Sequence, residues 1–315
     1  MKEIYTFASA DDRKTPIHAV KWTPDAGEPV AVMQLVHGMI EYIERYEEFA
    51  EYLAGKGFVV MGHDHIGHGD SVESPADWGI FHTKTPAATL VEDMYTNYCL
   101  IREQYPGLPH FILGHSMGSY LLRMFLCEKA DGIKDCAGAI VMGTGSVPDG
   151  TSKMGLTLIR LIEKFKGPDH KSGLMPKLSF GGKAYKGYNM DGSDPANSWL
   201  SKNLDSVTKY YHDPKDTFAF SLNGYRILME STSYDNQPEN LAKMNKALPV
   251  LIVSGAEDPV GDRSAGVKKV YEEFLQAGMR DVIYKLYEGD RHEILQETDR
   301  QQVFADIYDW AKARL

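Results

Sequence analysis

The sequence predicts an α/β fold, built as a mostly parallel eight-stranded sheet with helices on both faces and an inserted helical lid. Short apolar segments alternate with segments of helical periodicity, as they do in parallel sheets with crossover helices. Residues 30–36 are almost continuously apolar, which is expected of a strand covered on both faces. The alternation stops near residue 147 and resumes only near residue 248, which indicates an insertion.

The first two strands are expected at 3–8 and 17–23, and the turn-rich residues between them predict an antiparallel hairpin. Later strands are expected at 30–36, 58–61, 110–113, 138–142, 248–253 and 282–287. Helices are expected at about 42–54, 88–104, 264–277 and 301–314, with another from the end of strand 110–113 to about residue 129. In the helix at 88–104, the apolar face consists of Leu90, Met94, Tyr98 and Ile101.

Residues 147–230 differ from the rest because they are rich in Gly, Ser, Lys, aromatic residues and turn signals. We therefore expect a core formed by 1–146 and 231–315, with 147–230 as a lid. One helical face of the lid, from Met154 to Phe165, is apolar and could either pack in a core or accept an acyl chain. Aromatic residues that could shape the other side of a site are Phe180, Tyr185, Tyr188, Trp199, Tyr210 and Tyr211.

The composition excludes several classes of protein. A formal net charge of −10 without a Lys/Arg-rich block argues against a nucleic-acid partner. Cys99, Cys127 and Cys136 lack metal spacing and are expected to be reduced packing residues. The first residues do not resemble a signal peptide and no apolar run approaches the length of a membrane span, so the expected location is the cytoplasm.

The strand at 110–113 leads into Gly114-His115-Ser116-Met117-Gly118, and a helix is expected at once. Gly-x-Ser-x-Gly between a strand and a helix is the pattern of a nucleophile elbow. The turn is too sharp for side chains at its flanks, which accounts for Gly114 and Gly118. We therefore expect Ser116 to be a nucleophile, and the alternative is a plain Gly-rich turn.

A serine hydroxyl needs a base to remove its proton and a third group to orient that base. Asp258 and His292 each follow an expected strand, so both lie in loops at the strand ends, where Ser116 also lies. We expect His292 to be the base and Asp258 the orienting acid. Glu257 is the competing acid, Asp258 could simply initiate a turn before a proline, and His292 could be an exposed loop residue.

The oxyanion of an acyl-transfer intermediate needs two hydrogen-bond donors. The backbone N–H of Met117, directly after Ser116, is expected to be one of them. The loop after strand 30–36 reads His37-Gly38-Met39-Ile40-Glu41, and the backbone N–H of Met39 is expected to be the other.

In these motifs the chain resembles the monoacylglycerol lipase and lysophospholipase branch of the α/β-hydrolases, a family often labelled serine aminopeptidase S33. The resemblance covers nearly the whole chain. It rests on 37–41 with Arg45-Tyr46, Asp64 with Gly67-His68-Gly69-Asp70-Ser71, 114–118, 255–260 and Arg291-His292-Glu293. It implies hydrolysis of a lipid-type carboxylic ester through an acyl-enzyme, with no metal or cofactor. Hydrophobic docking of the lid on a membrane surface stays open, although the net charge argues against attraction to anionic lipids.

Two departures from the family pattern concern the substrate rather than the triad. The family commonly reads His-Gly-x-Gly-Glu-His, whereas Ile40 and Tyr42 replace the second Gly and the last His. Bulk at Ile40 is expected to narrow the acyl side of the pocket. Ile66 stands where the family has Arg before Gly-His-Gly, which is expected to alter the anchoring of that loop.

The segment from His63 to His68 contains residue types that bind zinc. A His-x-His-x-Asp-His metal pattern would need Asp at Gly67, so the pattern fails. We expect a structural loop instead, with His68 hydrogen-bonded near the site.

Two other functions stay open. An aminopeptidase or amidase would need an acidic anchor for the substrate amine, and the lid offers Glu163, Asp191, Asp194 and Asp205. A non-catalytic binding protein on the same scaffold would not need all three triad groups. A dehalogenase would need Asp at the elbow, which Ser116 excludes.

Overall fold

The computed structural model describes residues 1–315 and contains one eight-stranded sheet with the strand order β1-β2-β4-β3-β5-β6-β7-β8. β2 pairs antiparallel with both β1 and β4, and all other neighbours are parallel. The strands are β1 (Lys2–Ala8), β2 (Pro16–Trp22), β3 (Ala31–Val36), β4 (Phe58–His63), β5 (His110–His115), β6 (Cys136–Met142), β7 (Val250–Gly255) and β8 (Val282–Tyr287). The predicted fold and its N-terminal hairpin are therefore confirmed.

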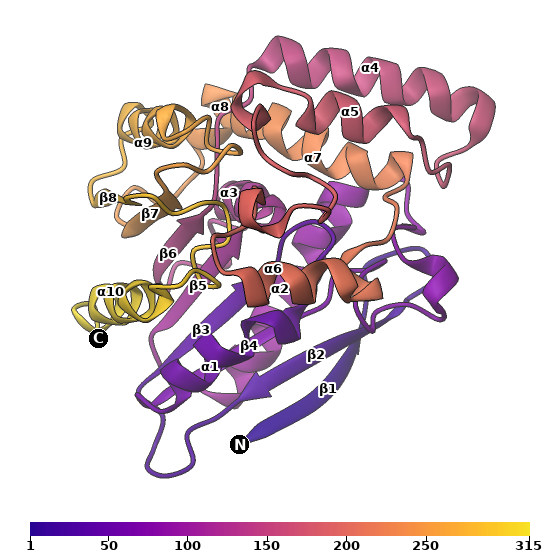
Figure 1. The fold of residues 1–315 in the computed structure, drawn as a ribbon. Coiled ribbons are helices and arrows are strands. Elements are labelled where there is room, and N and C mark those ends of the chain that lie inside the picture. The colour runs from indigo at the N-terminus through magenta and orange to yellow at the C-terminus, as the bar shows by residue number, and fades with distance from the viewer.

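Helices cover both faces of this sheet (Figure 1). One face packs against α1 (Glu47–Ala54) and α10 (Arg300–Lys312), and the other against α2 (Pro86–Gln104), α3 (Met117–Glu128) and α9 (Ala265–Gln276). In β5, Phe111 and Leu113 face the first group of helices while Ile112 faces the second. Because both faces are buried, β5 is apolar without alternation, as the sequence indicated.

The helix expected at about 42–54 starts later than the sequence predicts. The residues expected to open the helix at 42–54 form a 3-10 turn, Ile43–Tyr46, and the α-helix starts only at Glu47. The carboxylate of Asp64, in the loop after β4, accepts the backbone N–H of Ile43 at 2.7 Å. The turn is thus fixed by a tertiary contact that helical periodicity does not reveal.

Between β6 and β7 the chain forms α4 (Asp149–Lys166), α5 (Leu174–Phe180), α6 (Leu204–His212), α7 (Leu222–Asp235) and α8 (Pro238–Leu241). Figure 1 shows α4, α5 and α7 together above the ends of the strands. α7 packs on α4 and also on α2 and α3 of the core. The predicted end of the lid at residue 230 falls inside α7, and the division into core and lid stays a prediction.

The apolar face of α4 packs against the core only in part, through Ile162. The helix buries only Ser152 and Ile159, whereas Met154, Leu161 and Phe165 are exposed. None of the helices combines the length and the apolar character that crossing a bilayer requires. All three cysteines are free.

Candidate active site

Ser116 lies at the sharp turn between β5 and α3. Its backbone has φ 53° and ψ −119°, in a region that residues other than glycine rarely adopt. A Cβ at Gly114 would collide with the carbonyl group of Gly118, and one at Gly118 with the carbonyl groups of Val36 and His37. The two glycines therefore let the turn close and let α3 approach β3.

The structure brings Ser116, His292 and Asp258 together. His292 Nε2 lies 2.8 Å from Ser116 Oγ, and His292 Nδ1 lies 3.0 and 3.1 Å from the two oxygens of Asp258. Asp258 is fully buried and also accepts the Ser254 hydroxyl at 2.9 Å and the Val260 N–H at 2.8 Å. Burial alone would raise the pKa of Asp258, but His292 and these donors outweigh burial and lower it, so the carboxylate is ionised.

Glu257, the other acid considered as the partner of His292, is exposed, and Asp258 is the acid that lies beside His292 Nδ1. The imidazole ring of His292 is enclosed by two other rings. Trp199 of the lid stacks on it with the centroids 5.0 Å apart, and the His115 ring lies at 4.7 Å. The lid thus reaches the group that the sequence predicts to be the base.

The loop after β3 lies directly against the elbow. A Cβ at Gly38 would stand 2.9 Å from the Ser116 Cβ, so only glycine fits there. The N–H of Met39 donates to no atom of the protein, while Met117 is the first residue of α3. Both N–H groups therefore belong to backbone next to Ser116, and their role at an oxyanion stays a prediction.

The segment from His63 to His68 anchors this loop. His68 Nε2 accepts the N–H of Ile40 at 3.2 Å, and His68 Nδ1 lies 3.2 Å from the carbonyl oxygen of Ile66. One neutral tautomer satisfies both contacts, and burial lowers the pKa of His68 to about 4. Ile40 has φ 56°, a strained value for a β-branched residue at the position where the family has glycine.

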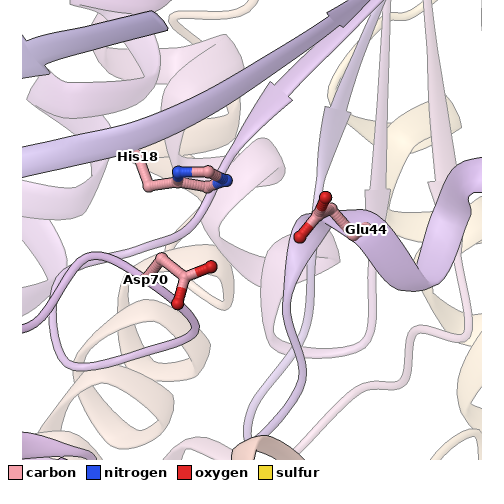
Figure 2. A group of neighbouring side chains, drawn as sticks. All are labelled: His18, Glu44 and Asp70. Carbon is pink, nitrogen blue, oxygen red and sulfur yellow. The ribbon is translucent and has the colours of Figure 1, made fainter. Parts of the chain in front are cut away.

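A cluster that could hold a cation lies apart from this site. The ligand atoms of His18, Glu44 and Asp70 lie within 4.8 Å of one another (Figure 2). Both carboxylates already have ammonium partners, since Lys2 lies 2.6 Å from Glu44 and Lys215 lies 2.7 Å from Asp70. None of the three lines the cavity at Ser116, so we assign the cluster no role in the site.

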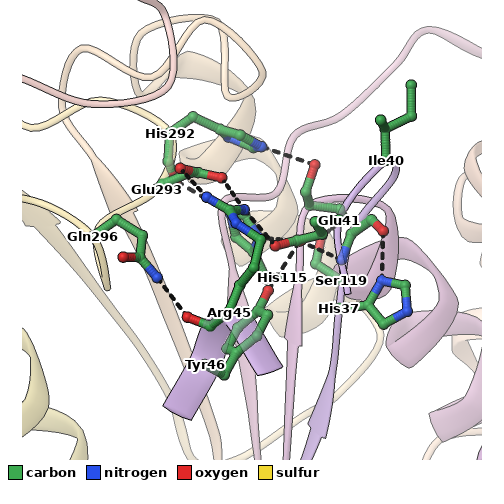
Figure 3. A network of polar contacts seen from close by, with 12 residues as sticks. His37, Ile40, Glu41, Arg45, Tyr46, His115, Ser119, His292, Glu293 and Gln296 are labelled. Carbon is green, nitrogen blue, oxygen red and sulfur yellow. Dashed lines mark hydrogen bonds and ion pairs between the residues drawn. The ribbon is translucent and has the colours of Figure 1, made fainter. Parts of the chain in front are cut away.

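Glu41 connects the loop after β3 with the elbow (Figure 3). It accepts the Gly38 N–H and the Tyr46 hydroxyl, and it pairs with His115 at 2.9 Å and with Arg45 at 3.0 Å. Burial would raise the pKa of Glu41, but His115 and Arg45 outweigh burial and lower it. Conversely, burial would lower the pKa of His115, but Glu41 raises it. This buried charge cluster holds the residues that flank Ser116.

Arg45 extends the cluster to the loop that carries His292. Its guanidinium donates to both oxygens of Glu293, at 2.6 and 3.0 Å. Glu41, Arg45, His115 and Glu293 all stand in the sequence motifs, yet reasoning from the sequence gave them no role. One signal was available in the sequence. The motifs that converge on one edge of the sheet each contain an acidic or basic residue, and such residues can pair with one another.

A cavity of about 1120 Å³ is lined by Ser116, His292 and many residues of the lid. Most of its lining is apolar, with lid contributions from Met154, Leu158, Met175, Leu178, Phe180, Leu228 and Met229. Five of the six lid aromatic residues line it; Tyr188 instead donates its hydroxyl to the Glu257 carbonyl. Of the four lid acids that the sequence offers as anchors for an amine, only Asp191 lines the cavity, and Asn189 and Ser193 already donate to it.

This sheet order, with the elbow after β5 and a cavity over the strand ends, defines an α/β-hydrolase. The chain belongs to the serine aminopeptidase S33 family, whose model matches residues 27–299. The resemblance inferred from the motifs is therefore confirmed.

Relatives and solved structures agree with this assignment. The chain is 28% identical to a monoglyceride lipase of Homo sapiens over 300 residues, covering 93% of this chain and 86% of that protein. It is 27% identical to a monoacylglycerol lipase of Mycolicibacterium smegmatis, covering 93% and 92%. A thermostable carboxyl esterase of Bacillus coagulans in complex with glycerol superimposes with a TM-score of 0.88 at 28% identity, covering 99% and 98%. These similarities place the chain among the ester hydrolases.

Proposed function

We propose that this chain is a serine carboxylic-ester hydrolase that cleaves a lipid-type ester, of the monoacylglycerol or lysophospholipid class, through an acyl-enzyme. The observation that carries the proposal is the contact of 2.8 Å between Ser116 Oγ and His292 Nε2, made inside a large apolar cavity. The opposite ring nitrogen faces the buried carboxylate of Asp258.

In the proposed reaction, Ser116 Oγ attacks the ester carbonyl while His292 Nε2 takes its proton. Asp258 holds the ring in orientation and stabilises the imidazolium. The N–H groups of Met39 and Met117 stabilise the oxyanion of the tetrahedral intermediate. His292 then protonates the leaving alcohol, which frees it and leaves an acyl-serine. A water molecule, deprotonated by His292, attacks the acyl-serine, and the collapse of the second intermediate returns the proton to Ser116.

The apolar walls from α4, α5 and α7 suit an acyl chain. Burying one methylene group is worth roughly 0.8 kcal/mol, so a few carbons change the affinity by an order of magnitude. We therefore expect medium or long acyl chains to be preferred over acetate.

A series of p-nitrophenyl esters from acetate to palmitate tests the proposal, with Ser116→Ala as the blank. We expect a rate maximum at medium or long chains that disappears in the folded variant. Activity that survives in purified Ser116→Ala would refute the assignment of the nucleophile. Activity only on acetate or butyrate would indicate a small-ester esterase, and faster cleavage of an aminoacyl p-nitroanilide in a parallel assay would favour the amidase alternative.

We also propose that the lid makes transient contact with a lipid surface. Leu161 and Phe165 on α4 are 56% and 74% exposed and do not line the cavity. Replacing both with Ser should lower the rate on an emulsified monoacylglycerol several-fold, since exposed apolar side chains supply the docking area. The rate on a dissolved p-nitrophenyl ester should stay as in the wild type. Equal loss on both substrates would contradict lipid contact.

A further inference from the structure

The lid carries one buried carboxyl group that the proposed reaction does not use. Asp216 ends the 3-10 turn Pro214–Asp216 between α6 and α7, is 3% exposed and lines the cavity that contains Ser116. Its Oδ1 atom has no hydrogen-bond partner, and its Oδ2 atom lies 3.3 Å from Arg45 Nε. A buried polar atom without a partner is costly, so we expect a partner from outside the chain.

Arg45 reaches only one oxygen of this carboxyl group, through Nε, because its two other nitrogen atoms, Nη1 and Nη2, are already engaged. It donates two hydrogen bonds to Glu293 and one to Glu41 (Figure 3). One cation thus faces three carboxyl groups in a buried place. Burial raises the pKa of Asp216 to about 8, with Glu293 and Glu41 adding to the rise and Arg45 opposing it. Near neutral pH the group carries a proton and can both donate and accept a hydrogen bond.

Asp216 lies at the polar end of the cavity. Arg45, its neighbour, lies over the ring of Tyr210 at 4.9 Å, and the Tyr210 hydroxyl donates to the carbonyl of Ile40 at 3.1 Å. Ile40 follows Met39 in the loop against the elbow, and Glu293 follows His292. The leaving alcohol must lie near His292, which protonates it, whereas α4, α5 and α7 line the cavity with apolar side chains. The polar end is therefore the end that suits the alcohol part of an ester.

We propose that Asp216 binds a free hydroxyl group on the alcohol part of the substrate and so gives the enzyme a preference for polyol esters over esters of simple alcohols. This inference rests on the proposed ester hydrolysis and adds to it a determinant of specificity. A site built to hydrogen-bond a substrate hydroxyl discriminates against an analogue without it, because the buried group is then left unpaired.

The test compares two decanoate esters that differ only in hydroxyl groups, the 2,3-dihydroxypropyl ester and the propyl ester. We expect the wild-type kcat/KM to favour the dihydroxypropyl ester by about tenfold or more. Asp216→Leu, similar in size but apolar, should reduce this ratio to near one. Asp216→Asn should keep most of it, because a carboxamide also donates and accepts. Asp205→Asn, an exposed acid on α6 of the same lid, should keep the wild-type ratio.

Three outcomes decide the matter. A wild-type ratio near one, or an unchanged ratio in folded Asp216→Leu, would overturn the inference and leave the proposed ester hydrolysis intact. If Asp216→Leu fails to fold, Asp216→Ala takes its place with the same expected loss of the ratio. Hydrolysis of neither ester by the wild-type enzyme would contradict the proposed function, and the inference with it.

Discussion

The wall of the cavity at the strand ends holds its charged groups far more tightly than the wall formed by the lid. At the strand ends, Asp258 accepts from Ser254, Val260 and His292, and Glu41 is surrounded by four partners. On the lid side, Asp216 has one long contact and an oxygen atom with no partner. Groups that perform chemistry have to be fixed in advance, whereas a group that selects a ligand needs an atom left unpaired for it.

The largest expected effect concerns the most tightly held group. Asp258→Asn should lower kcat by about 10⁴-fold with little change in KM, because the amide favours the wrong tautomer of His292. The exposed neighbour offers a matched control, and Glu257→Gln should keep the wild-type rate. Steady-state kinetics on one p-nitrophenyl ester measures both. Activity of Asp258→Asn within tenfold of the wild type would show that the tightly held groups at the strand ends do not perform the reaction.

A smaller effect is expected where Glu41 joins the loop after β3 to the elbow. Glu41→Gln removes the charge that pairs with His115 and Arg45 and should lower kcat by about 10²-fold, since small misplacements near the reacting atoms cost this much. It should also destabilise the fold by about 3–5 kcal/mol, because the buried His115 loses its carboxylate partner and the buried Arg45 loses one of its carboxylates. Glu44→Gln, which breaks only the partly exposed pair with Lys2, should change neither quantity measurably. A fall in melting temperature with normal kcat would make Glu41 purely structural.

The smallest expected effect concerns Asp216, on the lid side of the cavity. The pKa of Asp216 is raised to about 8 in the folded chain, by burial and by Glu293, Glu41 and Asp213 against Arg45, and is about 3.9 in an unfolded chain. The stability that the protonated group contributes is therefore full below about pH 4 and is lost as the pH rises toward 8. Asp216→Asn does not titrate, so it should gain on the wild type by on the order of a few kcal/mol across this range. Thermal unfolding at pH 4.5 to 8.5 measures the difference in stability between Asp216→Asn and the wild type. A difference independent of pH would contradict the raised pKa of Asp216.

The two walls also differ in how far the sequence predicts them. Ser116, Asp258 and His292 each follow a strand of the parallel part of the sheet, and parallel strands end at one edge, so local patterns suffice to bring them together. Asp216 stands in a lid turn without periodicity, and its neighbours Arg45 and Glu293 come from distant segments. No local signal distinguishes it from an ordinary surface acid.

The sequence also could not predict the backbone strain at Ile40 or the packing of α4. The sequence indicates bulk at Ile40, but it reveals neither its φ of 56° nor the hydrogen bond from its N–H to His68. The apolar face of α4 could be read as core or as substrate surface. The structure divides it, because Met154 and Leu158 line the cavity whereas Leu161 and Phe165 do not. That division depends on how α4 packs on α7, which only the tertiary structure gives.

The central claim is that Ser116 forms the covalent intermediate, and mass spectrometry tests it most directly. The enzyme would be treated with an alkyl fluorophosphonate, digested and mapped, with residual esterase activity measured at each time point. We predict a single phosphonyl adduct on Ser116 whose occupancy rises in proportion to the loss of activity. Full modification of Ser116 with activity retained, or complete inactivation with the adduct on another residue, would contradict the account.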